Sequence, residues 1–223
     1  MRTTTDLGLV PYITLREGEE RTPANLIITP EWPGQRFPRL RYADEGREDR
    51  DVRGVLWARC SQTERDERRM PTGEPRWKLM HPSRQRETMQ NLRCQVCVMP
   101  ARTSLGFVFL AGPGEYEPDA SSIITGQPPV CKRHLRAAAA LCPHVDGRPM
   151  AFLARSAPLY GVHGTVYGYG RDGIDVVATP DHPLPYGHPN QSTLLASQLV
   201  RRLNSFRIVD LDELLEELTP EAP

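Results

Sequence analysis

Lysine is almost absent from this chain of 223 residues, because Lys78 and Lys132 are the only two. Aromatic residues make up only 7% of the sequence, and no apolar run approaches the ~20 residues that a membrane-spanning helix needs. The N-terminus leads into no long apolar stretch, so we expect neither a signal peptide nor a membrane partner. The formal net charge is zero, which excludes a whole-chain attraction to nucleic acid. Arginine, proline and cysteine are therefore the informative residues.

The positive charge is distributed unevenly along the chain. Residues 53–102 carry eleven Arg or Lys against five Asp or Glu, whereas residues 206–223 carry one Arg against six acidic residues. Arginine pairs well with both carboxylates and phosphates because its guanidinium is a planar fork of donors. Two interpretations stay open: the basic segment pairs with the acidic one, or it contacts a partner. A GC-rich genome produces the same preference for arginine.

Two short cysteine and histidine pairs are the most specific feature. Cys94 and Cys97 are separated by two residues, and so are Cys131 and His134. This spacing suits two ligands on one tetrahedral Zn²⁺, and four such ligands close a structural site. We therefore expect one structural Zn²⁺ on these four side chains. A redox dithiol at Cys94 and Cys97 is the alternative.

The remaining cysteines fit a reducing environment. The chain has five cysteines, an odd number, and most of them cluster with histidines. This pattern favours metal-binding thiols in a cytoplasmic protein over a disulfide framework. Cys142 is expected to be a core thiol, and whether it forms a second metal site with His144 stays open.

The hydrophobic pattern predicts short strands in the first half and a mixture of strands and helices in the second. The expected strands lie within 9–15, 25–29, 39–42, 52–58, 104–111, 123–124, 150–155, 159–178 and 207–209. The expected helices are 82–93, 135–141, 192–206 and 211–218, and residues 61–77 are expected to form an exposed loop. Leu195, Leu199 and Leu203 recur at helical spacing in the third of these helices.

Residues 92–145 resemble the treble-clef zinc fingers. The order is a Cys-x-x-Cys turn, then strands, then a helix that starts with Cys131-x-x-His134. The resemblance implies an α+β fold in which a treble-clef zinc centre is flanked by short strands and a C-terminal helical segment. We expect one composite domain over 1–223, with a β-rich part at 1–81, a helix and zinc module at 82–145, and a β-hairpin with C-terminal helices at 146–223.

The treble clef also underlies the HNH-type nucleases, which place a general-base histidine inside the clef. No histidine occurs between Cys97 and Cys131 in this sequence, so the resemblance supplies no catalytic base there. We therefore expect a non-catalytic, zinc-stabilised protein that binds nucleic acid or a protein. The alternative is a metal-dependent HNH-type endonuclease with displaced catalytic residues. No nucleotide loop, nucleophile elbow or small-molecule site is evident, and the oligomeric state is open.

Two segments are candidate binding surfaces. Four arginines flank the first cysteine pair and are candidate phosphate ligands; they are Arg84, Arg86, Arg93 and Arg102. The acidic segment Asp210 to Leu218 is a candidate docking helix for a protein groove. Its expected contacts are Leu211, Leu214, Leu215 and Leu218.

Overall fold

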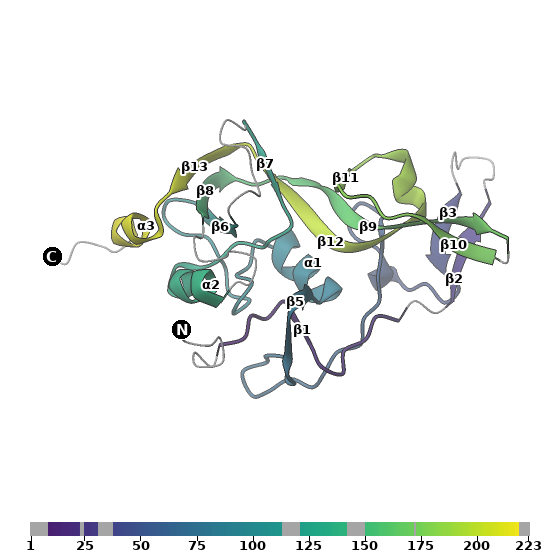
Figure 1. Ribbon diagram of the computed structural model, residues 1–223, viewed down its shortest axis with the longest axis horizontal. Coiled ribbons are helices and arrows are strands. Elements are labelled where there is room, and N and C mark those ends of the chain that lie inside the picture. The colour runs from purple at the N-terminus through teal and green to yellow at the C-terminus, as the bar shows by residue number, and fades with distance from the viewer. Residues whose placement is uncertain are drawn as a thin grey trace.

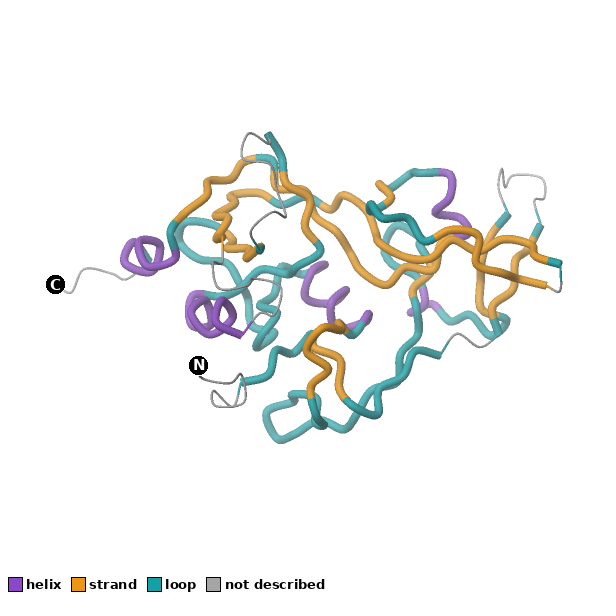
Figure 2. Tube along the Cα trace, viewed as in Figure 1, coloured by secondary structure: helices purple, strands orange, loops and turns teal. Residues whose placement is uncertain are grey.

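The computed structural model describes residues 9–22, 25–30, 38–112, 121–141, 150–171 and 173–218. Within these residues the chain is a mixed α/β protein in which strands predominate over three short α-helices (Figure 2). The helices are α1 (Pro82–Gln90), α2 (Leu135–Leu141) and α3 (Leu211–Glu217). The strands are β1 (Thr14–Arg16), β2 (Leu26–Thr29), β3 (Arg39–Tyr42), β4 (Leu56–Trp57), β5 (Pro75–Met80), β6 (Phe107–Ala111), β7 (Ile123–Thr125), β8 (Met150–Ser156), β9 (Leu159–Gly170), β10 (Gly173–Ala178), β11 (Leu184–Pro185), β12 (Leu194–Leu203) and β13 (Ser205–Val209).

The largest sheet is built on the long antiparallel pair β9 and β12. Its order is β10-β9-β12-β4, with β11 added to β9 and β7 added to β12. Helix α1 packs on β12, where the Gln85 side chain makes two 2.8 Å hydrogen bonds to the backbone of Leu199, one to N–H and one to C=O. These bonds satisfy the buried carboxamide of Gln85, whose burial without hydrogen-bond partners would destabilise the fold. The helix is thereby fixed against the centre of the sheet.

A second sheet, in the order β13-β8-β6, lies near α2 and α3 at one end of the molecule. Figure 1 shows β2, β3 and β10 at the opposite end and α1 between the two groups. Buried residues of α2, α3 and one set of side chains from this sheet form a hydrophobic cluster that includes Cys94, Leu135 and Leu214. The alternate side chains of the sheet, among them Phe109 and Phe152, belong to a separate cluster. The cysteine pairs are therefore part of a core and not of an isolated surface loop.

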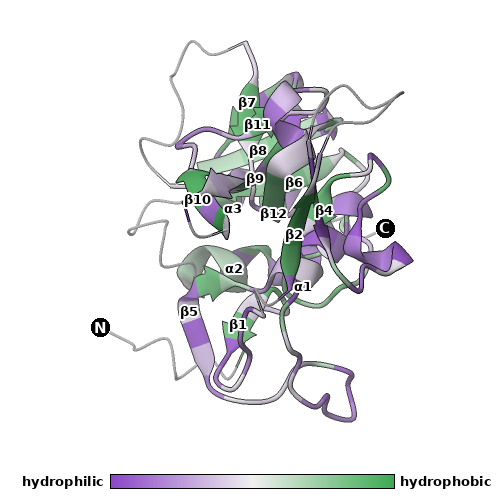
Figure 3. Cartoon of the chain, turned by 90° about the vertical axis from the view of Figure 1, so that its right-hand side faces the viewer, coloured by the Kyte–Doolittle hydropathy of each residue, from purple (hydrophilic) through white to green (hydrophobic). Residues whose placement is uncertain are grey.

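Most of the expected elements are confirmed, but residues 61–77 are only partly the loop that we expect. The strand β5 begins at Pro75 and pairs with β1. Figure 3 shows β5 as hydrophilic over most of its length, and its side chains are mainly exposed or half-buried. Such a strand shows little hydrophobic alternation, which explains why the sequence pattern does not reveal it.

The expected helix at 192–206 is wrong. Residues Leu194–Leu203 form the strand β12, preceded by a 3-10 turn at Pro189–Thr193. Irregularities in the β9–β12 register lie between Ala196 and Gln198 and between Val200 and Arg201. They break the two-residue alternation of a strand, and both faces of β12 are largely buried. The buried leucines therefore recur with a spacing that imitates a helix.

The acidic C-terminal helix is confirmed as α3, but its leucines do not form a docking face. Leu214 is 0% and Leu218 is 8% exposed, and both pack in the cluster that contains Cys94. The acidic side chains of α3 pair with Arg136 and Arg207, not with the basic segment 53–102. No helix in the described ranges is both long and apolar enough to cross a bilayer.

Candidate metal centre

The first cysteine pair lies in a tight turn directly after α1. Leu92 and Val98 adopt positive φ angles of 50° and 63°, which reverse the chain on either side of the pair. The Cys94 N–H donates to the Met99 carbonyl at 2.8 Å, and the Val98 N–H donates to the Cys94 carbonyl at 2.9 Å. This short hairpin holds both thiols on its inner side, where Cys94 is fully buried.

The second pair lies where a strand-like segment enters a helix. Val130 bridges Val108 on β6, and Cys131 then caps the 3-10 turn Lys132–His134 that continues into α2. The His134 N–H donates to the Cys131 carbonyl at 2.9 Å, which closes the turn. Residues three apart in such a turn lie on one side, so Cys131 and His134 face the same point.

The four side chains meet with the spacing of a tetrahedral site. The Cys97 and Cys131 sulfurs are 3.8 Å apart, and His134 Nδ1 lies 3.3 Å from the Cys131 sulfur and 4.0 Å from the Cys94 sulfur. A Zn–S bond of ~2.3 Å in a regular tetrahedron gives an S···S edge of ~3.8 Å. All four ligand atoms lie within 4.8 Å of one another. The residues present therefore fit a Zn²⁺ ion, with Nδ1 as the imidazole ligand.

The electrostatics of the cluster favour a bound cation. Hydrogen bonding from Cys131 lowers the pKa of the Cys94 thiol to about 5, although burial opposes this change. The same hydrogen bond raises the pKa of Cys131, and burial raises the pKa of Cys97. Three thiolates this close repel one another, so only the first proton leaves readily. A divalent cation removes this repulsion and binds all three sulfurs as thiolates.

The turn that carries Cys94 and Cys97 is tied to distant segments by its backbone. Tyr12 N–H donates to the Val96 carbonyl at 3.2 Å, and Gln95 N–H donates to the Pro129 carbonyl at 3.0 Å. The Lys132 ammonium donates to the Leu218 carbonyl at the end of α3 at 2.5 Å. The cluster therefore joins the N-terminal segment, the end of α1, β6, α2 and α3.

Two of the four arginines expected to bind phosphate are occupied within the protein. Arg84 is 2% exposed, and its guanidinium forms two hydrogen bonds to Glu19, at 2.5 and 2.6 Å. Arg86 is half-buried, donates to the carbonyls of Glu48 and Arg50, and stacks on Trp57. The prediction for Arg84 is therefore corrected, because a buried and paired guanidinium does not reach a phosphate.

Arg93 and Arg102 are exposed beside the cysteine turn. Arg93 donates to the Val98 carbonyl at 3.2 Å, and the Arg102 guanidinium lies 5.3 Å from the centre of the Phe107 ring.

Cys60 is half-buried and is not part of the cluster. Cys142 and His144, the candidates for a second metal site, lie outside the described residues.

Sequence reasoning missed one prominent polar group, the buried Glu19. Its carboxylate accepts from Arg84 and from the Arg16 N–H, the latter at 2.7 Å. Nothing in the local sequence distinguishes Glu19 from the exposed Glu20 beside it. The partners of Glu19 on α1 and at Thr63 are more than 40 residues away, so only the tertiary fold identifies it.

Comparisons with protein families, with curated proteins and with solved structures found no match for this chain. Function is therefore inferred from the cluster and its surroundings.

Proposed function

We propose that Cys94, Cys97, Cys131 and His134 hold one structural Zn²⁺ in a treble-clef-like module that binds nucleic acid. The observation that supports the zinc site is the convergence of three sulfurs and one imidazole nitrogen within 4.8 Å of one another. Three thiolates and an imidazole complete a tetrahedral shell, which is typical of structural zinc and leaves no position for a reacting water.

The resemblance to a treble clef extends to the order of elements but not to the strand pairing. β6 and β7 pair with β8 and β12 and not with each other. Val130 instead supplies the antiparallel bridge to β6 just before the second ligand pair. We therefore regard the module as a variant of the treble clef. In this variant the strand that would pair with β6 is reduced to the single β-bridge at Val130.

The nuclease alternative receives no comparable support. HNH-type catalysis needs a divalent ion at the reacting phosphate in addition to any structural zinc. Within the described ranges, the zinc cluster is the only group of three or more His, Cys, Asp or Glu side chains with the spacing of a metal site. We therefore propose a binding role and no catalytic residue.

The charge around the cluster supports a nucleic-acid partner. Residues 88–112 and 121–141 contain no Asp or Glu, but they contain five cations; these are Arg93, Arg102, Lys132, Arg133 and Arg136. Arg136 pairs with Asp212 and Lys132 with a carbonyl. Arg93, Arg102 and Arg133 are exposed, and no carboxylate among the described residues pairs with them. Exposed arginines without a carboxylate partner are suited to phosphate oxygens.

Replacing Arg93, Arg102 and Arg133 by alanine is expected to weaken binding to a mixed-sequence DNA or RNA probe. Each lost phosphate contact reduces the slope of log K against log salt by about 0.9 on duplex DNA. Three contacts correspond to about a 40-fold change in affinity between 50 and 200 mM salt. The measurement is fluorescence anisotropy of a labelled probe over that salt range.

The matched control replaces three other exposed arginines, Arg68, Arg76 and Arg171, by alanine. The net charge changes equally in both variants, so a general charge effect weakens both alike. If the two variants show the same slope of log K against log salt and the same zinc content, then Arg93, Arg102 and Arg133 are not the phosphate ligands. No binding by the unaltered protein to any probe would remove the nucleic-acid role.

A further inference from the structure

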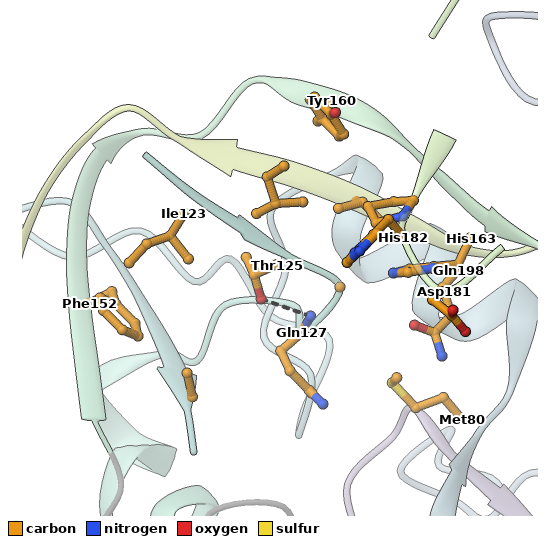
Figure 4. A pocket seen from close by; sticks show the side chains of 15 residues that line it. Met80, Ile123, Thr125, Gln127, Phe152, Tyr160, His163, Asp181, His182 and Gln198 are labelled. Atoms are coloured by element: carbon orange, nitrogen blue, oxygen red, sulfur yellow. Dashed lines mark hydrogen bonds between the residues drawn. The ribbon is translucent and has the colours of Figure 1, made fainter. Parts of the chain in front are cut away.

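A cavity of about 680 Å³ opens between β7, β9, β12 and the segment before β11, and none of the four candidate metal ligands lines it. Figure 4 shows His163, Asp181, His182 and Gln198 gathered at one side of this cavity. Ile123 and Phe152 line the opposite side, and Thr125 and Gln127 lie between. The volume is in the range of small-molecule sites, which are about 300–1,000 Å³.

The register of the large sheet places the polar side chains together. His163 on β9 lies directly opposite Gln198 on β12, next to the register irregularity after Ala196. Side chains of directly opposed residues project to the same face of a sheet. β11 pairs with β9 at Leu184 and Val162, so the preceding residues, Asp181 and His182, lie alongside the same part of β9.

Gly161 makes this close approach possible. A Cβ atom at Gly161 would lie 2.0 Å from the Leu184 carbonyl oxygen, so any side chain at this position would clash with β11. Without this glycine β11 could not reach β9, and the segment that carries His182 would lie farther from His163. The pairing of β11 with β9 therefore places the segment that carries His182 beside the strand that carries His163.

Four polar side chains of the lining have no hydrogen-bond partner within the part of the chain that the structure describes. The side chains of His163, His182 and Gln198 make no hydrogen bond to any residue in the described ranges, and neither does the carboxamide of Gln127. Gln85 provides the contrast, because its carboxamide is bonded to the backbone at Gly126 and Leu199. His163, Gln127 and Gln198 are half-buried and His182 is exposed, so their donors and acceptors face the open cavity, where a ligand can reach them.

The described lining offers no cationic side chain to an anionic ligand. Among the residues that the structure describes, no lysine or arginine lines the cavity, and Asp181 is the only carboxylate in the lining. Burial, and then the nearby His182, lower the pKa of His163 below its ordinary value. This shift favours the neutral imidazole of His163, which offers one donor and one acceptor.

We propose that this cavity binds a purine nucleobase. A purine is flat and uncharged, with alternating donors and acceptors on its edge. A glutamine carboxamide pairs in a bidentate way with the N6 and N7 edge of adenine, and Gln127 and Gln198 both lie in the lining. Of the apolar lining residues, Ile124 is 40% exposed and would contact the face of the ring, with Ile123 beside it. A sugar has no flat apolar face of comparable extent and would leave this side unused.

The test is calorimetric titration of the full-length, zinc-loaded protein with adenosine and guanosine, which carry no phosphate. One of them is expected to bind, with at least tenfold preference over glucose. His182→Ala and Gln198→Leu are each expected to weaken binding about tenfold, the effect of one lost hydrogen bond of ~1.4 kcal/mol. The matched control is His188→Ala, which replaces another histidine of the same segment that also precedes a proline and does not line the cavity.

Several outcomes would overturn the proposal: no nucleoside binds, His182→Ala binds as tightly as the unaltered protein, or Zn²⁺ or glucose binds in place of the nucleoside. Competition with a purine-rich single strand distinguishes the sources of the base. If the strand displaces the nucleoside, the natural ligand is a base within a nucleic acid. If the strand does not displace it, the natural ligand is a free nucleoside. The variant that lacks Arg93, Arg102 and Arg133 is expected to retain nucleoside binding, so failure of this site and failure of the arginine surface are distinguishable.

Discussion

Chelation of the metal is expected to unfold the half of the protein that contains α2, α3 and the β13-β8-β6 sheet. The cluster that includes Cys94, Leu135 and Leu214 is packed around the ligands. Zinc binding contributes about 10–16 kcal/mol in small zinc-binding peptides, whereas whole proteins are stable by only about 5–15 kcal/mol. Loss of the ion therefore removes an energy as large as the entire stability. Circular dichroism and hydrogen exchange before and after chelation measure the effect.

The substitution Cys94→Ser is expected to reproduce the effect of chelation without a chelator. A serine hydroxyl is not deprotonated at neutral pH and is a poor zinc ligand. The matched control is Cys60→Ser, because Cys60 is a half-buried free thiol outside the cluster. If Cys94→Ser retains both stoichiometric zinc and the stability of Cys60→Ser, then Cys94 is not a ligand.

The second large effect is expected at Glu19. Its carboxylate is 1% exposed and compensates Arg84, while Arg16 is also buried nearby. Glu19→Gln leaves two buried guanidinium groups without a carboxylate. Removing one partner of a buried ion pair destabilises a protein by about 3–5 kcal/mol because the remaining charge is uncompensated. Urea denaturation measures the change in the free energy of unfolding.

The exposed pair between Arg207 and Glu217 provides the control for Glu19. Glu217→Gln is expected to have little measurable effect, because solvent screens exposed ion pairs. Equal denaturation midpoints for Glu19→Gln and Glu217→Gln would contradict the importance of the buried pair.

Glu19 also predicts a pH dependence of stability. Burial alone would raise the pKa of Glu19, but hydrogen bonds from Arg84 and from the Arg16 backbone lower it to about 2, from an ordinary value of 4.5. Because the folded pKa is the lower one, the stabilisation is complete above about pH 4.5 and is lost as the pH falls toward 2. The difference in stability between the unaltered protein and Glu19→Gln is therefore expected to shrink over this range. Taking the difference removes the separate effect of acid on zinc binding.

The convergence of the four candidate metal ligands could be predicted from the sequence because the spacing within each pair is local information. Two residues between ligands in each pair specify the geometry of the pair, and the helix at 135–141 follows from a run of alanines. The pairing of the two halves needs only that one ion accepts four ligands. The agreement at Cys94, Cys97, Cys131 and His134 therefore follows from coordination chemistry.

The features that could not be predicted depend on contacts between distant residues. Whether Arg84 is a surface cation or a buried partner depends on Glu19, 65 residues away. Likewise, β12 resembles a helix in sequence because register irregularities disturb its alternation. The cavity at His163 requires four segments to converge, and none of them carries a recognisable motif alone.

The most direct measurement is X-ray absorption spectroscopy, with elemental analysis, of protein purified without added metal. We predict one zinc per chain with three sulfur ligands at ~2.3 Å and one nitrogen at ~2.0 Å. Absence of stoichiometric zinc would contradict the account, and so would a shell of four sulfurs, because it would replace His134 by another cysteine.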